Sequence, residues 1–530
     1  MIRSGPIRVK VFPMQKVIPP ELKIDVSAQP FALSDATLSR ADGAVVLLEK
    51  ASRPDKAVDT LPQAAVWRKL LRAHQRSGQE SPILVTRLPN RRQTLVVVGF
   101  VKPGATGFER LDLAGKLARE ALKPGVARLQ LHANEFTAPG ERAAALEAVL
   151  SAVLAHAAPM PEQKSKKPPV AHDLAHVDIA DRASDLYDRS RAIAAGNHLA
   201  RWLAALPPNV LDSIAYRAAL QKLARREGWS FKFYGIPQLE KIGAGAFLAV
   251  ARANPHRGAG IVRLTYKPKR ARPTGASKGA AGIALVGKGI CFDTGGINLK
   301  PHRGMYTMHG DMQGSSVAVG TLLALTRLDA SYPIDCWLAI TENEIGPNAF
   351  RPQEVVHAIN GVTIQVVHSD AEGRMVLADT LTLASREKPR FMLDFATLTG
   401  ACVNALTDRY AGAFTNRAGL HDWLQQTGRH CGERVWCFPM DEDFDTELEC
   451  PGADVLQCTL DSKGDHILAA RFLSKFVEAT VPWVHVDLAP SERKGGLAHV
   501  PTEMTGFGVR YAVHLLGDAS ELDAQLRSLA

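Results

Sequence analysis

Four carboxylates of this 530-residue sequence stand in loops next to apolar segments. They come from three separate stretches of chain and are Asp293, Asp311, Asp370 and Glu372. Like charges cannot stay ionised together in a partly buried site, because each raises the pKa of the others unless a cation compensates them. Two divalent ions would balance four carboxylates, and oxygen-rich sites of this kind hold pairs of Zn, Mn, Mg or Co ions. The residue types therefore predict a hydrolase with two metal ions.

Glycine-rich strings surround these acids. Residues 286–296 read VGKGICFDTGG, residues 308–312 read MHGDM, and residues 368–374 read HSDAEGR. Taken singly, each acid could be a turn residue or a helix cap, since Asp precedes Thr-Gly-Gly in the first string. Four such acids together with lysines in glycine-rich loops favour the metal site over that simpler interpretation.

The elements that must position these strings alternate between strand-like and helix-like patterns. From residue 260 onward the expected strands are 260–266, 283–286, 334–340, 363–368, 391–395 and 484–488, with helices at 315–328 and 376–385. This alternation predicts an α/β domain with a mixed, mostly parallel sheet sandwiched between helices. In such sheets ligands bind beyond the carboxyl ends of strands. The three strings that contain the acids follow or adjoin these strands and helices, so their side chains can lie at the carboxyl edge of the sheet.

The N-terminal third predicts a smaller α/β domain. Its expected strands are 44–48, 82–86, 94–98 and 126–131, and its expected helices are 111–122 and 143–157. Residues 159–169, PMPEQKSKKPP, are typical of a linker, because proline and lysine exclude a core-packed element there. One or two helices are expected over 173–206 and another over 216–226. We therefore expect an N-terminal domain at 1–165 and a catalytic domain at 173–530.

Composition sets the broad class. With 46% hydrophobic and 22% charged residues the chain is an ordinary globular protein, which excludes disorder and coiled coil. No apolar run of about 20 residues and no signal-peptide pattern is found, so no membrane span and a cytoplasmic location are expected. The seven cysteines form no C-x-x-C pair, which favours reduced structural thiols.

The three glycine-rich strings together resemble the leucyl (cytosol) aminopeptidase family of dinuclear metallopeptidases. The similarity continues through residues 206–209 (LPPN), 397–401 (TLTGA) and 505–510 (TGFGVR), and it covers about residues 190–515. The N-terminal domain resembles the family only in size and α/β character. The resemblance implies a metal-dependent aminopeptidase that acts on peptides and assembles as a homohexamer.

The resemblance also implies a role for each acid. Asp293 and Glu372 would bridge two divalent ions, Mn²⁺ or Zn²⁺, and Asp370 would complete one of the two sites. Lys288 and Asp311 would complete the other. Only a neutral amine can bind a metal, so the pKa of this lysine must fall from its free value of about 10.4, as burial and a neighbouring dication would make it do.

Further residues would act on the substrate in a family member. A water or hydroxide between the metals would attack the first peptide carbonyl, protonated Lys300 would stabilise the oxyanion, and Arg374 would hold a bicarbonate as general base. The free α-amine of the substrate would bind a metal, which limits cleavage to the N-terminus. The implied pocket for a Leu-like side chain is lined by Met308, Thr397, Gly400 and Ala401.

One departure from the family pattern lies inside the third string. His368-Ser369 stands where the family usually has Asn-Thr, which bears on substrate preference and not on metal binding. His368 and His309 are interpreted as polar residues near the mouth of the cleft and not as extra metal ligands.

Two other functions remain open. A two-metal phosphoesterase shares the carboxylate bridges, although it normally adds histidine ligands. Alternatively, the N-terminal domain binds nucleic acid and peptidase activity is secondary or absent. The formal net charge of +10 arises entirely in residues 1–175, which hold 26 Lys+Arg and 16 Asp+Glu. No helix-turn-helix pattern accompanies this charge, so a solvated basic face is the simpler interpretation.

Overall fold

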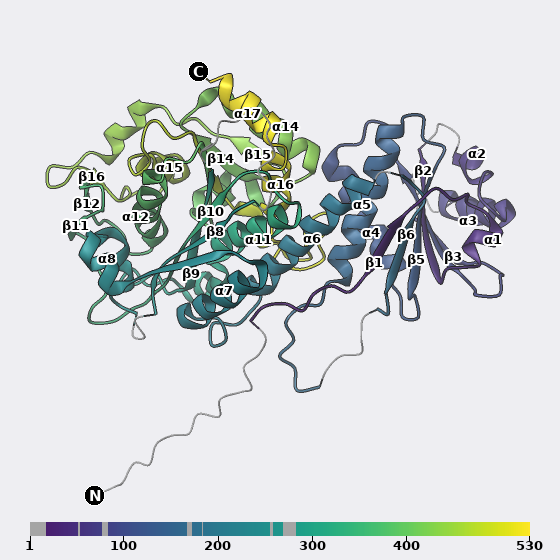
Figure 1. The fold of residues 1–530 in the computed structure, drawn as a ribbon, viewed down its shortest axis with the longest axis horizontal. Coiled ribbons are helices and arrows are strands. Elements are labelled where there is room, and N and C mark those ends of the chain that lie inside the picture. Colours follow the sequence, from purple (N-terminus) through teal and green to yellow (C-terminus); the bar gives the residue numbers. More distant parts are fainter. Residues whose placement is uncertain are drawn as a thin grey trace, which may run out of the picture.

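Two β-sheets organise the chain, and they lie side by side along its longest axis (Figure 1). The computed structural model describes residues 17–50, 54–76, 83–166, 172–182, 184–254, 258–268 and 282–529. Both sheets carry helices on both faces, which confirms the expected α/β fold with a smaller N-terminal and a larger C-terminal part.

The N-terminal sheet has the strand order β1-β6-β5-β2-β4-β3. All neighbours are parallel except β3 and β4. Its strands are β1 (Asp25–Ala28), β2 (Gly43–Glu49), β3 (Leu84–Arg87), β4 (Leu95–Val101), β5 (Arg128–Asn134) and β6 (His176–Ile179). Its helices are α1 (Asp35–Leu38), α2 (Pro54–Val58), α3 (Ala64–Arg76), α4 (Gly107–Ala121) and α5 (Pro139–Ala157).

Strand β2 shows why this sheet needs helices on both sides. Val45 and Leu47 belong to the apolar cluster formed with α4 and α5, whereas Val46 and Leu48 belong to the one formed with α1 to α3. Successive side chains of a strand point to opposite faces, so a continuous apolar run must be covered twice.

Strand β6 corrects the sequence-based prediction for residues 173–206. A helix was expected throughout, but the first part is a strand that pairs with β1 and β5, and the helix α6 spans Ser184–Ala204. The N-terminal sheet therefore extends past the proline- and lysine-rich stretch. The division into domains at 1–165 and 173–530 stays a prediction.

The C-terminal sheet has the order β15-β14-β17-β13-β9-β10-β8-β7. Its central strands β17, β13, β9 and β10 are mutually parallel, and antiparallel pairs flank them. The strands are β7 (Ser230–Gly235), β8 (Gly260–Tyr266), β9 (Ile283–Asp293), β10 (Ile334–Asn343), β13 (Phe391–Ala396), β14 (Ala411–Thr415), β15 (Val435–Cys437) and β17 (Trp483–Asp487). A separate small sheet contains β11 (Val355–His357), β12 (Thr363–Gln365) and β16 (Val455–Leu456).

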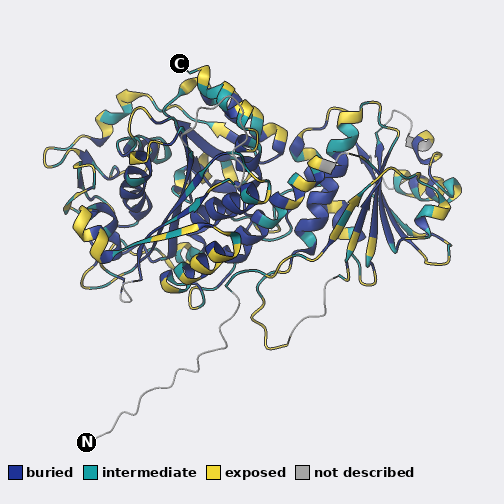
Figure 2. Ribbon diagram, in the orientation of Figure 1, coloured by how far each residue is buried: buried dark blue, intermediate teal, exposed yellow. Residues whose placement is uncertain are grey.

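Helices cover both faces of this sheet, and Figure 2 shows its central strands buried, whereas the edge strand β7 is partly exposed. One apolar cluster includes α6, α11 (Gln313–Arg327) and α16 (Val509–Leu516), and the other includes α9 (Gly245–Ala251), α12 (Glu372–Arg386) and α15 (Asp465–Ser474). The remaining helices are α7 (Ser213–Glu227), α8 (Ile236–Ile242), α10 (His302–Met305), α13 (Gly400–Leu406), α14 (His421–Cys431) and α17 (Ala519–Arg527). Within the described ranges no helix is long and apolar enough to cross a membrane.

A buried ion pair joins the two parts of the chain. Glu147 of α5 accepts from both terminal nitrogens of Arg510 on α16, at 2.9 and 2.7 Å. Ser151 and Ser190 also donate to Glu147, at 2.8 and 2.9 Å. The Glu147 carboxylate therefore accepts four hydrogen bonds at the junction of the two parts.

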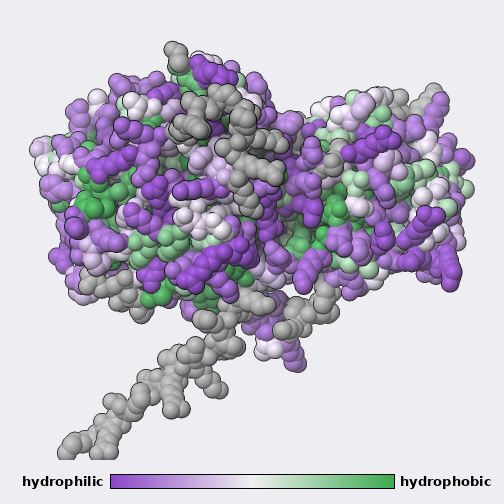
Figure 3. Space-filling view, in the orientation of Figure 1, coloured by the Kyte–Doolittle hydropathy of each residue, from purple (hydrophilic) through white to green (hydrophobic). Residues whose placement is uncertain are grey.

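Some basic residues of the N-terminal part are paired with acids. The face in Figure 3 is mostly hydrophilic. Arg68 pairs with Asp59 at 2.5 Å and Arg92 with Asp42 at 2.8 Å, so part of the basic excess is locally compensated. Binding of nucleic acid stays an untested prediction.

Candidate metal centre

The site forms where parallel strands end. Strand β9 ends at Asp293, the adjacent β10 ends at Asn343, and β13 ends at Ala396. Helix α12 begins at Glu372 beside them. Strand β9 is longer than the expected 283–286, and this extension carries the chain through Lys288 to Asp293. The carboxyl edge of the sheet is the place where α/β sheets bind ligands.

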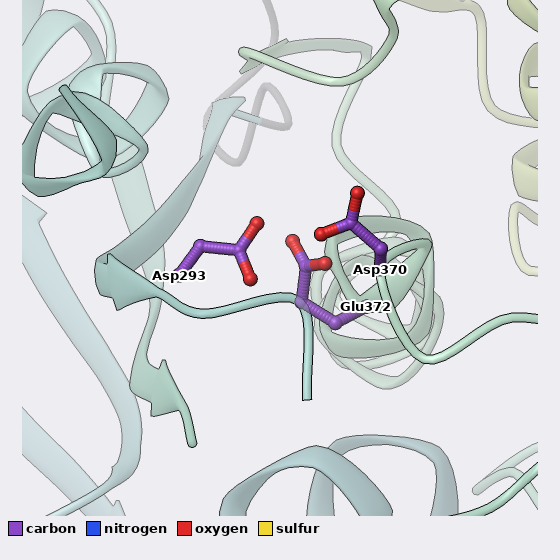
Figure 4. Close-up of side chains that lie close together, drawn as sticks. All are labelled: Asp293, Asp370 and Glu372. Carbon is purple, nitrogen blue, oxygen red and sulfur yellow. The ribbon is translucent and has the colours of Figure 1, made fainter. Parts of the chain in front are cut away.

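Three carboxylates of this edge point toward one another (Figure 4). Asp293, Asp370 and Glu372 each offer an oxygen, and these oxygens lie within 4.8 Å of one another. Oxygens about 2.0 to 2.2 Å from one ion lie at most about 4.4 Å apart, so small side-chain movements suffice for a shared ion. Asp293 and Glu372 are buried, whereas the Asp370 side chain is 27% exposed. The donors fit a metal centre with one side open to solvent.

Lys288 and Asp311 complete the group on its inner side. The Nζ of Lys288 lies 2.8 Å from Oδ1 of Asp311 and 2.9 Å from Oε1 of Glu372. A Cβ at position 373 would lie 2.6 Å from this Nζ, so Gly373 makes room for the lysine on the first turn of α12. The structure thus brings together all five residues predicted as metal ligands.

Lys300 lies among the same carboxylates. Its Nζ is 2.8 Å from Oδ2 of Asp293 and 2.6 Å from Oδ1 of Asp370. Four carboxylates and two ammonium groups leave a formal charge of −2. The surplus is negative even when both lysines are protonated, which favours binding of cations.

The pKa values of the acids show the same crowding. Burial and the charge of Asp293 raise the pKa of Glu372, and burial also raises the pKa of Asp311 and Asp370. Burial alone would lower the pKa of Lys288, but the neighbouring carboxylates outweigh it and raise that pKa, opposite to the fall expected for a metal ligand. A divalent ion that takes over these carboxylates would remove this effect and favour the neutral amine. Among the described residues the buried Oδ2 of Asp311 has no hydrogen-bond partner. A carboxylate oxygen left in this way is a suitable metal donor.

Asn343 is a site residue that sequence reasoning missed. Its Nδ2 donates to Oδ1 of Asp293 at 2.8 Å and to the carbonyl oxygen of Ser369 at 3.0 Å. The Ser369 hydroxyl in turn donates to the carbonyl of Gly295 at 2.6 Å. Asn343 and Ser369 therefore hold the loops that present Asp293 and Asp370. The only local signal was a polar residue at the end of an apolar strand.

The residues predicted to bind the substrate lie around this group. The Thr397 hydroxyl donates to Oδ1 of Asp311 at 2.7 Å, so this side chain contacts a candidate ligand. Met308 is half-buried in a 3₁₀ turn, Gly400 is exposed and Ala401 is half-buried at the start of α13. Their contact with substrate stays a prediction.

Arg374 is buried two residues after Glu372. Its Nη2 donates to Oδ2 of Asp465 at 2.8 Å, and its Nη1 donates to the carbonyl oxygen of Gln457 at 3.3 Å. Neither partner was identified from the sequence, because each lies in a distant segment. The bicarbonate expected at this guanidinium stays a prediction at this point.

Clustered acids and lysines at the carboxyl edge of a mixed α/β sheet are an arrangement that suits a metal-dependent hydrolase. The model of the cytosol aminopeptidase family, catalytic domain, matches residues 198–513. The chain belongs to this family and is a metallo-aminopeptidase, which confirms the resemblance read from the sequence.

Individual relatives agree with this assignment. A probable cytosol aminopeptidase of Rhodopseudomonas palustris is 35% identical over 477 residues, 87% of this chain and 92% of the relative. One of Corynebacterium diphtheriae is 37% identical over 362 residues, 68% of this chain and 70% of the relative. The solved structure of the bottromycin maturation enzyme BotP in complex with Mn has a TM-score of 0.76 at 28% identity, covering 92% of this chain and 99% of that one.

Proposed function

We propose that this enzyme removes the N-terminal residue from peptides, prefers Leu-like apolar residues, and uses two divalent metal ions. The observation that carries the proposal is the convergence of three carboxylates within 4.8 Å beside a lysine and a fourth acid. The proposed ligands are Lys288, Asp293, Asp311, Asp370 and Glu372.

The donor set supports a pair of ions. Asp293 and Glu372 would be shared, Asp370 would serve one ion, and Lys288 with Asp311 would serve the other. Bound divalent ions lower the pKa of water and polarise a carbonyl group. Mn²⁺ or Zn²⁺ suits such ligands, and the similar structure of BotP was solved with Mn.

Lys300 is proposed to remain a charged donor at the reacting carbonyl. Burial lowers its pKa, but Asp293 and Glu372 outweigh burial, so the pKa is raised and the ammonium keeps its proton. An ammonium fixed by two carboxylates is oriented before the substrate arrives. Preorganised donors of this kind stabilise an oxyanion as it forms.

The proposed metal ions also support exopeptidase specificity. The lone pair of a free, neutral α-amine could bind one of the ions, whereas the nitrogen of an acylated amine is a poor metal donor. The residues proposed to accept the side chain of the first substrate residue are small or apolar, apart from the hydroxyl of Thr397. They are Met308, Thr397, Gly400 and Ala401. We further propose a cytoplasmic homohexamer, on family resemblance.

Metal depletion and reconstitution tests the proposed function. Protein stripped with a chelator and reloaded with Mn²⁺ or Zn²⁺ should bind two ions per chain and hydrolyse leucyl anilide. N-acetylated leucyl anilide and phenyl phosphate should remain intact. Equal hydrolysis of the acetylated substrate would contradict an aminopeptidase, and hydrolysis of phenyl phosphate alone would favour the phosphoesterase.

A further inference from the structure

Arg374 has a protein partner where the family resemblance implies a bicarbonate. The guanidinium side chain is 2% exposed, and its Nη2 lies 2.8 Å from Oδ2 of Asp465. Burial alone lowers the pKa of Arg374, but the Asp465 carboxylate outweighs this and raises it. The two groups therefore form a charged, hydrogen-bonded pair, and Arg374 stands two residues after Glu372 on α12.

Asp465 is fixed by the fold. It is the first residue of helix α15, which packs against α12, the helix that carries Arg374. Gly464 before it has a φ of 62°, in the left-handed region that favours glycine, and this turn starts the helix. An acid in the first turn is also stabilised by the helix dipole. The side chain is 20% exposed, so it is not a freely moving surface acid.

The guanidinium is buried, which closes its remaining donors to a second anion. An arginine holds a planar anion through two parallel N–H groups. Asp465 accepts from Nη2 and Gln457 accepts from Nη1, and Nε has no partner among the described residues. Each terminal nitrogen keeps one further N–H, but the side chain is only 2% exposed, so a planar anion would have to displace Asp465 to reach two parallel N–H groups.

The charges around Arg374 also disfavour a bound bicarbonate. One guanidinium already compensates the Asp465 carboxylate, so a bicarbonate beside it would meet a like charge. The other cations of the centre are engaged, because Lys288 and Lys300 each lie within 2.9 Å of two carboxylates. The described residues around Arg374 therefore do not fit bicarbonate.

We propose that Asp465 is the built-in carboxylate partner of Arg374, taking the place at the guanidinium that family resemblance gives to bicarbonate. Turnover is then independent of bicarbonate. This inference rests on the proposed aminopeptidase activity. Asp465 acts through Arg374 and is a positioning residue.

Bicarbonate titrations of the metal-loaded full-length enzyme test this. In buffer freed of carbon dioxide, kcat of the wild type for leucyl anilide should stay constant as bicarbonate is added. In Asp465→Ala, kcat should fall about tenfold while KM changes less than about twofold, as for loss of an interaction made in the transition state. Added bicarbonate should restore most of that loss, because the site is now open.

Matched variants separate this role from a structural one. Asp465→Glu keeps the charge and should retain bicarbonate independence, whereas the uncharged Asp465→Asn should lose kcat. Asp461→Ala removes an exposed acid of the same loop, paired with exposed Lys463, and should change neither kcat nor its response to bicarbonate. Metal content and thermal midpoint, measured for each variant, identify any that is misfolded or unloaded.

Calorimetric titration with bicarbonate supplies a readout without turnover. Asp465→Ala should bind bicarbonate and the wild type should not. Bicarbonate binding to the wild type, or its activation severalfold, would overturn the inference. A folded, metal-loaded Asp465→Ala variant with normal kcat would also overturn it.

The other two variants decide the question if Asp465→Ala does not fold. A lower kcat in Asp465→Asn, together with bicarbonate-independent turnover in Asp465→Glu, supports the inference. A normal kcat in Asp465→Asn overturns it. A metal-loaded wild type without aminopeptidase activity would refute the proposed function, while calorimetry would still decide this inference.

Discussion

The Nζ of Lys288 lies 2.9 Å from Oε1 of Glu372, although the lysine belongs to β9 and the glutamate opens α12. Two elements must therefore approach closely for this pair to form. Gly373 permits the approach, because a Cβ there would lie 2.6 Å from the lysine nitrogen. The geometry of the centre depends on a residue that provides no ligand itself.

Replacing Gly373 should therefore disturb the metal centre. In Gly373→Ala the methyl group displaces Lys288, so metal content should fall and kcat should drop at least tenfold, about 1.4 kcal/mol in transition-state stabilisation. Metal analysis and kinetics check this. Gly140→Ala in helix α5 is the control. A Cβ at position 140 would have no atom within 4 Å, so metal content and kcat should stay unchanged. Unchanged metal content and activity in Gly373→Ala would mean that Lys288 is not needed at the centre.

Substitutions of Glu372 and of Lys300 should affect metal binding and catalysis differently. Glu372→Gln removes a proposed shared carboxylate, so metal content should fall together with activity. Lys300→Ala removes a proposed oxyanion donor, so the metals should stay while kcat falls about 10²- to 10³-fold. Metal analysis with steady-state kinetics distinguishes the two. Full activity in either variant would refute the role given to that residue.

Asn343 should affect metal affinity although it is not a proposed ligand. Its amide orients the Asp293 carboxylate through a 2.8 Å hydrogen bond. Residues that orient ligands typically change metal affinity about 10- to 100-fold when lost. Asn343→Ala should therefore need more Mn²⁺ for half-maximal activity. Asn360→Ala, which removes an exposed amide bonded to a distant carbonyl, is the control. Identical metal dependence of both variants would contradict the assigned role.

The sequence predicted the elements whose signals are local. Strands such as 260–266 could be found from their apolar runs, and the acids could be found because they lie in glycine-rich strings. The strand His176–Ile179 was missed, since four residues give too little pattern and their pairing partners lie in β1 and β5.

The predicted ligands converge in the structure, but the residues that orient Asp293 and Arg374 could not be foreseen. Asn343 and Asp465 act through hydrogen bonds to distant segments, at Asp293 and Arg374. An isolated asparagine or aspartate has no spacing that reveals such a partner. Only the folded arrangement of β9, β10, α12 and α15 brings these side chains together.

The ion pair between Glu147 and Arg510 should make the free energy of unfolding depend on pH in the acidic range. Burial tends to raise the pKa of Glu147, but the charge and hydrogen bonds of Arg510 outweigh it and lower the pKa from 4.5 to about 2. A carboxyl with a lowered folded-state pKa stabilises the protein above its unfolded pKa. That contribution is lost as pH falls from about 4.5 to about 2.

Glu147→Ala should reveal this contribution, because it leaves Arg510 buried without its partner. The variant should lose about 3 to 5 kcal/mol of unfolding free energy at pH 7. Its stability should also fall less than that of the wild type as the medium is acidified, since the titrating group is absent. Denaturant unfolding from pH 7 to pH 3 measures both. Asp112→Ala removes an exposed pair with Lys116 and should cost less than about 1 kcal/mol. Parallel pH profiles for wild type and Glu147→Ala would show that this carboxyl is not the group that titrates, because only a shifted pKa produces the difference in slope.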